Sequence, residues 1–463
     1  MLGLISLRRK FVWASAVCVC SLSFSTTGVL GQGSLLIERL PEQSMPGLQR
    51  LLDAAMTESS NMQIRDLIEE NYEGRRMVSD SAKQFQLGGR ASYRKEEDVE
   101  RENSEIRDRV YYSLTLSKAL YHWGALEANK QKGNLYLRME ELNTFESYRN
   151  LALDVRKRYM NALIARKDIE LSQNSLELYR KQLEVEEKRF ESGTASSIQV
   201  YDLRLRVDGV ELDILKKENA FLGEVDTLAR IIGMEPSAVE QSFAADLPKR
   251  ESLDADSIGE LGRLFDDGIA QSASIARSSK AIEVYEKDLH IANQRRKPKI
   301  GLAMGLTQYD LDDRGARRAE EIFYGGVSIA WSFFDGSATR GAKRSAIANL
   351  DRMKTEYEQA KSSYRFNLEQ AQKLLDLNAR VLERDEIALE RAREHIVNIT
   401  EDYDAGRVSF NDFGRVEQSL LSQEIRTYRS RAAYLNSLAE MASLLGFDPS
   451  SQKFIDSRSD ASE

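Results

Sequence analysis

Apolar residues recur at helical spacing through most of the chain. In the segment 119–192 they are separated by three, four or seven positions, and the set consists of Val155, Tyr159, Ala162, Ile169, Leu176, Tyr179, Leu183 and Phe190. The segment 196–232 has the same rhythm, in Ile198, Tyr201, Leu205, Leu212, Leu215, Leu222 and Ala229. Such spacing is typical of a coiled-coil seam. We therefore expect the two segments to turn at Gly193 and to pack as an antiparallel hairpin through these two sets.

The pattern occurs twice, and its landmarks lie 213 positions apart. Gly193 corresponds to Gly406, Ser196 to Ser409, and Ile232-Gly233 to Leu445-Gly446. Because glycines and helix ends coincide without a gap, the chain contains a duplicated unit. The second unit is expected to have an outgoing helix over 334–405, a turn at Gly406 and a return helix over 408–445.

Each unit begins with a further helical segment, so that the first repeat spans 46–232 and the second 257–445. The initial segments are 46–85 and 257–297, and the return helices are about half as long as the outgoing ones. We expect the segment 257–297 to stack end to end on the return helix 196–232. The linker 233–256 would then lie at mid-height of a tall helical pillar.

Four shorter stretches alternate between apolar and small or polar residues, which is the period of a β-strand with one apolar face. They form two predicted hairpins, at about 87–118 and about 299–332, with polar loops at 94–107 and 310–321. Their length suits tilted strands that cross an outer membrane. Because open sheet edges are not tolerated in lipid and four strands cannot close a barrel, strands from several chains must combine.

The N-terminus indicates the compartment. Arg8, Arg9 and Lys10 precede an apolar run from Phe11 to Phe24, and cleavage before Gln32 would remove residues 1–31 as a signal peptide. No later stretch approaches the about 18 consecutive apolar residues of a membrane-spanning helix. We expect residues 32–45 to be extended and residues 446–463 to form a C-terminal tail.

Composition narrows the class of protein. The 463 residues are 41% hydrophobic and 30% charged and include only 6 prolines, which suits long uninterrupted helices. A net charge of -8 argues against nucleic acid as a partner. The three histidines are scattered, and no zinc, phosphate-loop or nucleophile motif occurs, so neither catalytic residues, nor a cofactor, nor a metal site is predicted. The predicted fold class is mainly α with a membrane β-barrel.

The chain resembles the TolC family of outer-membrane efflux proteins. The resemblance rests on the signal peptide, the duplication, the aromatic-glycine turns, and the junctions Leu120-Tyr121-His122-Trp123-Gly124 and Phe333-Phe334-Asp335-Gly336. It implies a homotrimer with a twelve-stranded barrel in outer-membrane lipid and a helical periplasmic tunnel. It also implies docking to a periplasmic adaptor protein and an inner-membrane pump, with passive export of small molecules or proteins by efflux or type I secretion. The alternative is a periplasmic coiled-coil scaffold, which would not need two paired strand hairpins.

The resemblance also implies candidate pore residues. Acidic side chains after the second hairpin glycine constrict the tunnel in that family, and these positions fall on Asp412 and on Arg415, which departs from the pattern. The corresponding residues of the first repeat are Gln199 and Asp202. A ring of aspartates would attract cations. Alternatively, Asp412 stabilises the first turn of the return helix, where the helix dipole favours an acid.

Two further groups of residues are candidates. Adaptor contacts are implied at the hairpin turns and their flanks, where solvated loop ends are the alternative; these residues are Gly193, Gly406, Arg189, Thr194, Ser197, Arg407, Ser409 and Asn411. An aromatic belt at the membrane interface is expected from residues near the strand ends, namely Trp123, Trp331, Tyr111, Tyr112 and Tyr121.

Overall fold

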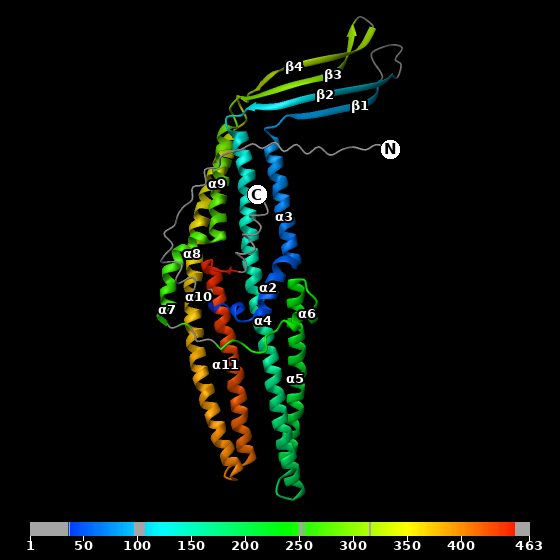
Figure 1. The fold of residues 1–463 in the computed structure, drawn as a ribbon. Coiled ribbons are helices and arrows are strands. Elements are labelled where there is room, and N and C mark those ends of the chain that lie inside the picture. The colour runs from blue at the N-terminus through cyan, green and yellow to red at the C-terminus, as the bar shows by residue number, and fades with distance from the viewer. Residues whose placement is uncertain are drawn as a thin grey trace, which may run out of the picture.

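The computed structural model describes residues 36, 38–96, 107–249, 253, 255–313 and 316–449. A four-stranded sheet stands at one end of a long helical body, and two helical hairpins form the other end (Figure 1). The predicted signal peptide and residues 450–463 lie outside the described residues. None of the helices in the described ranges combines the length and apolar character needed to cross a membrane.

The elements follow the two repeats. The first repeat consists of η1 Pro41–Gln43, α2 Pro46–Glu58, α3 Ser60–Ser81, β1 Gln86–Glu96, β2 Arg107–Tyr121, α4 Ala125–Glu191 and α5 Ser197–Ile232, followed by α6 Pro236–Gln241. The second consists of α7 Ala255–Glu260, η2 Leu261–Leu264, α8 Phe265–Gln271, α9 Ala273–Gln294, β3 Lys299–Asp313, β4 Ala316–Ala330, α10 Ala338–Asp404 and α11 Phe410–Leu445. The duplication extends to helix length, since α4 and α10 each have 67 residues and α5 and α11 each have 36.

The initial helical segments are interrupted, which the sequence pattern did not predict. The backbone is extended at Ser59 (ψ 124°) between α2 and α3, and at Ser272 (ψ 119°) between α8 and α9. These serines are 213 positions apart, so the interruption belongs to the repeat. The Ser272 hydroxyl accepts a hydrogen bond from the Ile275 amide at 3.4 Å, which stabilises the new helix start.

The long helices begin later than expected, at Ala125 and Ala338. Two consecutive residues precede each start in the left-handed region: Trp123 (φ 54°) with Gly124 (φ 80°), and Gly336 (φ 59°) with Ser337 (φ 75°). Each junction therefore contains one glycine and one strained residue, in opposite order. This pair of left-handed residues redirects the chain from the sheet into the helix.

The long helices lie side by side and form one wall. Towards the hairpin tips the neighbours are α10, α11, α4 and α5, and towards the sheet they are α10, α9, α4 and α3 (Figure 1). The expectation that 257–297 stacks on α5 is wrong within the chain, because α3 stands over α5 and α9 stands over α11. Each strand hairpin returns the chain beside the helix that it left, which keeps α3 next to α4.

The predicted contact face of α5 is also wrong. The α5 residues buried in the hairpin with α4 include Val200, Val207, Ile214 and Phe221, which form a heptad row of their own. The row expected to contact α4 is exposed instead, from Ile198 through Leu222; only Ala229 of that set is buried. Helix α5 therefore carries two apolar rows, of which the fold of one chain uses one.

The sheet has the order β1-β2-β3-β4 and is antiparallel throughout. Pairing places Leu87 opposite Leu116, Leu114 opposite Leu306, and Ile300 opposite Ile329, so the apolar residues of all four strands share one face. The opposite face carries small and polar residues, among them Gly88, Ser113, Thr115, Ser117, Gly301, Ala303, Gly305, Thr307, Gly326 and Ser328.

The strands are longer than the apolar alternation predicts. Pairing continues to Asp313 opposite Ala316, so most of the expected loop 310–321 is strand, and the first hairpin pairs out to Glu96 opposite Arg107. Backbone hydrogen bonds need no apolar side chain, which is why the ladder extends beyond the alternating residues. Residues 97–106 and 314–315 lie outside the described residues.

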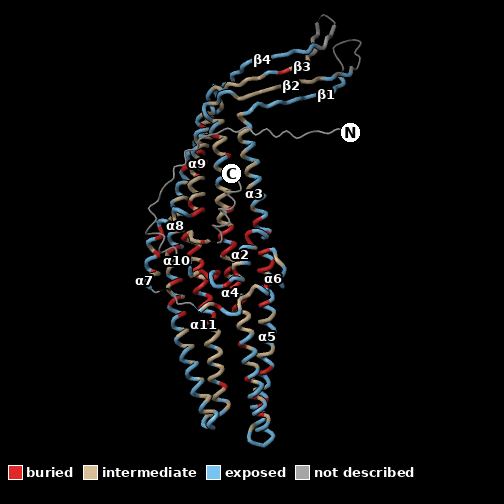
Figure 2. Tube along the Cα trace, in the orientation of Figure 1, coloured by how far each residue is buried: buried red, intermediate tan, exposed pale blue. Residues whose placement is uncertain are grey.

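The main hydrophobic core lies at mid-height, where α2 packs against α4 and α5 (Figure 2). In its described part, the segment 32–45 is not extended as expected, since Pro41–Gln43 form η1 and Leu40 and Met45 are buried in this core. Burial of these apolar side chains favours a compact helical turn over an extended segment.

A buried ion cluster fastens both ends of the described chain to α4. Arg156, which is 1% exposed, donates to Glu42 at 2.5 and 3.1 Å and to Asp448 at 2.9 Å. Burial alone would lower the pKa of this guanidinium, but attraction by Asp448 and Glu42 and their hydrogen bonds outweigh burial and raise it. Asp448, the third residue of the expected tail 446–463, is buried in this cluster, so the first part of that segment is held against α4.

Candidate functional site: the hairpin tips and the open edges of the wall

The first hairpin tip is a glycine turn closed by side-chain caps. Gly193 has φ 75°, and the amide of Thr194 donates to the Arg189 carbonyl at 2.8 Å. The Thr194 hydroxyl reaches the same carbonyl at 3.0 Å. Because Thr194 satisfies helix-end acceptors, its side chain already has a structural role at the tip. The predicted contact residue Ser197 is the exposed first residue of α5.

The second tip repeats this turn and adds a charged pair. Gly406 has φ 72°, and Arg407 donates to the Asp402 carboxylate at 2.5 and 2.8 Å. Ser409 caps α11 by accepting from the Asp412 amide at 3.2 Å, and Asn411 is exposed beside it. The tip is thus held by hydrogen bonds of its own side chains, while Asn411 stays open to contact.

The pore candidates occupy the first turns of the return helices. The Ser409 hydroxyl donates to Asp412 Oδ2 at 2.7 Å, and Arg415 donates to Oδ1. These two interactions, the serine hydrogen bond first, lower the pKa of Asp412. Gln199 holds the corresponding position in a capping box, with its Oε1 2.8 Å from the Ser196 amide, while Asp202 is exposed one turn on. Both Asp412 and Gln199 therefore take part in the N-terminal cap of their helix. That these positions constrict the tunnel stays a prediction.

The Asp412–Arg415 pair lies beside a surface groove between α10 and α11. The groove has a volume of about 470 Å³ and is also lined by Arg391 and His395. Arg415 is 80% exposed and Asp412 49% exposed, so both groups contact solvent. The pair carries one negative and one positive charge, so its formal charges cancel.

An aromatic cluster at the second tip was missed by the sequence analysis. Tyr403 stacks on Phe413 at 5.2 Å, and Phe410 lies within 5.7 Å of Tyr403 between ring centroids. The first tip has Phe190, Ser197 and Val200 at these positions. A comparison of the two repeats could have predicted the cluster, because two of its three positions are aromatic only in the second repeat.

The five candidate interface aromatics divide between two levels of the sheet. Tyr121 contacts Trp123 at the helix junction, with ring centroids 5.1 Å apart, and Trp331 follows Ala330, which pairs with Lys299 at the same end of the sheet. Tyr111 and Tyr112 lie further along β2, and as sequence neighbours they point to opposite faces of the sheet. Of these two, only Tyr112 shares the apolar face, so a single belt of all five is not formed by one chain.

Both indole N–H groups are used within the chain. Trp123 donates to the Pro298 carbonyl at 2.7 Å, and Trp331 donates to the Arg296 carbonyl at 3.0 Å. The short link between α9 and β3 is therefore held by one tryptophan from each repeat. This second function of the tryptophans could not be predicted from their position at strand ends.

In the part of the chain that the structure describes, the two edges of the wall are apolar and have no strand or long helix on their outer side. One edge consists of β1, α3 and α5, and its exposed apolar residues on the helices are Ile64, Leu67, Met77, Val78, Ile198, Tyr201, Leu205, Leu212, Leu215 and Leu222. The other consists of β4 and α10, whose exposed helical residues include Phe366, Leu374, Leu377, Val381, Ile387 and Val397. Large exposed apolar stripes of this kind mark association surfaces.

A sheet with one apolar and one small-polar face, continuous with a helical wall and open at both edges, defines a channel-forming subunit of a membrane. Residues 69–234 and 264–447 match the model of the family described as outer membrane efflux protein, one stretch in each repeat. The chain belongs to this family. It is an outer-membrane channel with a large helical periplasmic part, and the alternative of a scaffold outside the membrane is set aside.

Similar proteins agree with this assignment. The alkaline protease secretion protein AprF of Pseudomonas aeruginosa is 21% identical over 345 residues, which cover 73% of this chain and 70% of that protein. The fold is similar to the CmeC outer membrane channel of Campylobacter jejuni, with a TM-score of 0.73, 13% identity, and coverage of 88% of each chain. It is also similar to the outer membrane protein VceC of Vibrio cholerae, with a TM-score of 0.68, 18% identity, and coverage of 86% and 96%.

Proposed function

We propose that three copies of this chain form one exit duct, in which the edge β1–α3–α5 of each copy joins the edge β4–α10 of the next. The observation that supports this assembly most strongly is the second apolar row of α5, which is exposed from Ile198 to Leu222. Joining two different edges is a heterologous contact, and such contacts close into a ring when the rotation fits. Three four-stranded sheets would give a twelve-stranded barrel.

In the proposed duct the apolar sheet face contacts lipid and the small and polar face lines the channel. The duct would conduct solutes or proteins from the periplasm to the exterior without performing chemistry. The hairpin tips would dock a periplasmic adaptor and, through it, an inner-membrane pump. The similarity to a secretion protein and the match to the outer membrane efflux protein family support both kinds of cargo.

The pore and docking residues complete this proposal. Asp412 and Arg415, with Gln199 and Asp202 on the neighbouring tip, would line the periplasmic entrance. Ser197 and Asn411 are the best placed adaptor contacts because they are exposed in the first turns of α5 and α11. The aromatic residues Trp123, Trp331 and Tyr121 would mark the periplasmic membrane interface and Tyr112 a level closer to the exterior.

The test changes the exposed row of α5. Leu212→Glu with Leu215→Glu places charges on side chains that are 53% and 62% exposed in one chain, so the helix itself should still form. The expected result is loss of the trimer by native mass spectrometry in detergent and loss of conductance in a planar bilayer, with an unchanged helical signal by circular dichroism. Lys216→Glu, at an exposed position outside the row, is the matched control. A double variant that stays trimeric and conducts as the wild type would contradict the proposed contact.

A further inference from the structure

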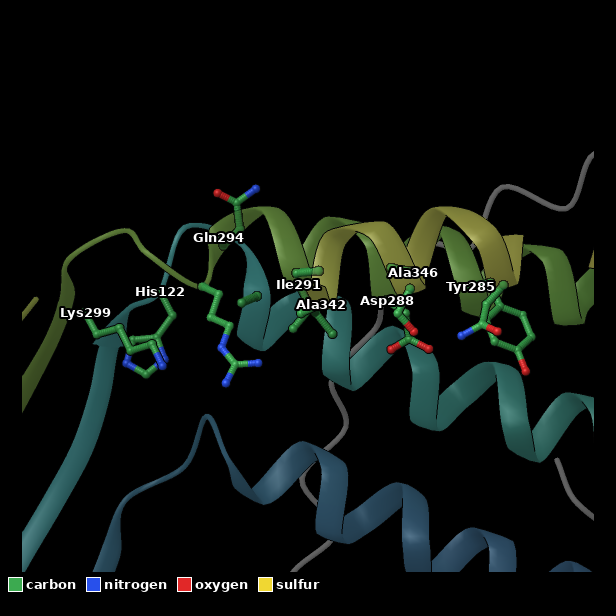
Figure 3. A pocket seen from close by; sticks show the side chains of 13 residues that line it. His122, Tyr285, Asp288, Ile291, Gln294, Lys299, Ala342 and Ala346 are labelled. Atoms are coloured by element: carbon green, nitrogen blue, oxygen red, sulfur yellow. The ribbon is translucent and has the colours of Figure 1, made fainter. Parts of the chain in front are cut away.

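The end of α9, the start of β3 and the start of α10 enclose a pocket with a volume of about 420 Å³. His122, Arg295 and Lys299 bring two permanent cations and an imidazole to its lining. Figure 3 shows the His122 ring beside the Lys299 side chain, whereas Gln294 points the opposite way. Polar side chains of Tyr285, Ser345 and Asn349 complete the lining and can donate hydrogen bonds.

The cations of this pocket are not neutralised by the acid nearby. Asp288 also lines the pocket, but Lys132 donates to its carboxylate. Within the described residues, Arg295 and Lys299 form no salt bridge, although the charge of Arg295 helps to lower the pKa of the Asp335 carboxyl. Burial and the charge of Lys299 lower the pKa of His122, so its imidazole is neutral at pH 7 and can donate a hydrogen bond from one nitrogen.

The first repeat shows that these cations are not needed for folding. Its residues at the positions of Arg295 and Lys299 are Ala82 and Gln86, and the helix α3 nevertheless leads into β1 by the same short link. The charged residues nearby in that repeat are paired, since Lys83 contacts Glu127 at 2.5 Å. The excess of positive charge therefore belongs to one repeat only, in a chain whose net charge is -8.

The pocket lies on the channel side of the proposed duct. Ile300 is on the apolar face of the sheet, opposite Ile329, and its neighbour Lys299 therefore belongs to the small and polar face. A ligand that reaches Lys299 from this side is a solute in the channel rather than a lipid headgroup. This step rests on the proposed function, because a closed duct is what separates the two faces.

We propose that His122, Arg295 and Lys299 form a binding site for small anionic solutes that carry a phosphate or carboxylate group, one site per subunit at the base of the barrel. Arginine binds such groups by paired hydrogen bonds, and lysine adds a point charge. Three such sites around the channel would raise the local concentration of anions at the point where the helical tunnel meets the sheet.

The test uses tryptophan fluorescence of the detergent-purified chain titrated with inorganic phosphate. Trp123 and Trp331 both contact the link 295–298, and the third tryptophan, Trp13, lies in the predicted signal peptide. The expected result is a saturable change that potassium chloride of equal ionic strength does not produce. Arg295→Ala with Lys299→Gln, which installs the residues of the first repeat, should weaken phosphate binding by about tenfold or more.

Two controls decide the outcome. Lys343→Ala with Arg344→Ala removes the same charge from exposed positions of α10 and should leave binding within about twofold of wild type. Equal weakening by both double variants would show a general charge effect and overturn the site. Tighter binding of dihexanoyl phosphatidylglycerol than of phosphate, lost in the first variant only, would assign the pocket to lipid and overturn the solute proposal.

Bilayer recordings separate this site from the proposed duct. Phosphate should reduce the conductance of the wild-type channel and not that of the Arg295→Ala, Lys299→Gln channel. Conductance without any effect of phosphate on conductance or fluorescence would contradict the pocket and leave the duct intact. Absence of conductance together with saturable phosphate binding would contradict the duct alone.

Discussion

Arg156 in the middle of α4 donates two hydrogen bonds to Asp448, a residue 292 positions further along the chain and just beyond the end of α11. Glu42, near the start of the described chain, binds the same guanidinium. One side chain of the first repeat therefore joins the beginning of the fold to its end. The three charged groups lie in the mid-height core, where their attraction is poorly screened.

Replacing Arg156 should destabilise the fold strongly. Arg156→Met removes the guanidinium to which both buried carboxylates hydrogen-bond, and breaking a buried ion pair in this way costs about 3–5 kcal/mol. Thermal unfolding followed by circular dichroism checks this. Lys157→Met breaks the half-exposed pair with Glu440 and should cost at most about 1 kcal/mol. Similar melting temperatures for the two variants would show that the buried cluster does not hold the core together.

Ser337 is the strained counterpart of Gly124 at the strand-to-helix junction. Its φ of 75° is costly for a residue with a Cβ, so Ser337→Gly should stabilise the protein by about 1 kcal/mol. The Ser337 side chain makes no capping hydrogen bond, so little is lost in exchange. Gly124→Ser, which also brings a Cβ within 2.9 Å of His290, should destabilise instead. Shifts of the same sign in the two melting temperatures would contradict this account.

The contact between Gly414 of α11 and Gln182 of α4 should determine how closely the two hairpins approach. A Cβ on Gly414 would lie 1.8 Å from the Gln182 amide nitrogen, so Gly414→Ala requires Gln182 to move. We expect destabilisation of about 1–3 kcal/mol. Gln182→Ala in the same chain should recover most of the loss, because it removes the clashing atoms. A double variant no more stable than Gly414→Ala alone would show that the clash is not the cause.

Removing Arg415 should expose the charge of Asp412 at the proposed entrance. In the Arg415→Ala channel the carboxylate no longer has its cation, so the cation preference measured from reversal potentials should increase. Arg407→Ala removes an equal charge at the same tip but from a pair with Asp402, and is the control. If both variants change selectivity equally, Asp412 has no special position in the pore.

The same carboxylate should respond to acid only below its ordinary range. Hydrogen bonds from Ser409 and Arg415 lower the pKa of Asp412 from 3.8 in the folded state. The stability that these bonds give is present above pH 3.8 and is lost as the pH falls through the lower folded value. Cation preference of the wild-type channel, in which Arg415 still binds Asp412, should therefore be equal at pH 7 and pH 5. A decline already at pH 5 would contradict the lowered pKa.

The sequence predicted the elements better than it predicted their partners. The glycine turns at Gly193 and Gly406 and the apolar face of the sheet follow from local chemistry, and the structure has them where expected. The contact face of α5 was wrong because heptad spacing marks an apolar row without telling which helix covers it. Either of the two apolar rows of α5 could contact α4, and only the three-dimensional packing shows which of them does.

The pattern of apolar and polar residues could not predict contacts between residues that are far apart in the sequence. Nothing local to Arg156 indicates that Glu42 and Asp448 converge on it, and nothing in Ser337 shows that it adopts a left-handed conformation. The candidate residues at the tips were found at the expected turns, yet their capping hydrogen bonds became visible only with the side chains in place. The basic pocket likewise needed the pairing of β3 with β4 to assign its face.

The open edges of the sheet also have a consequence for biogenesis. Among the described residues, the backbone N–H and C=O groups along the outer sides of β1 and β4 pair with no other strand, and hydrocarbon offers no hydrogen-bond partner. A single copy would therefore pay a desolvation penalty along two whole strands if it entered the bilayer alone. In the proposed assembly, insertion is therefore favourable only after all three copies have joined. The lipid bilayer would thus exclude incomplete assemblies, which would form leaky channels.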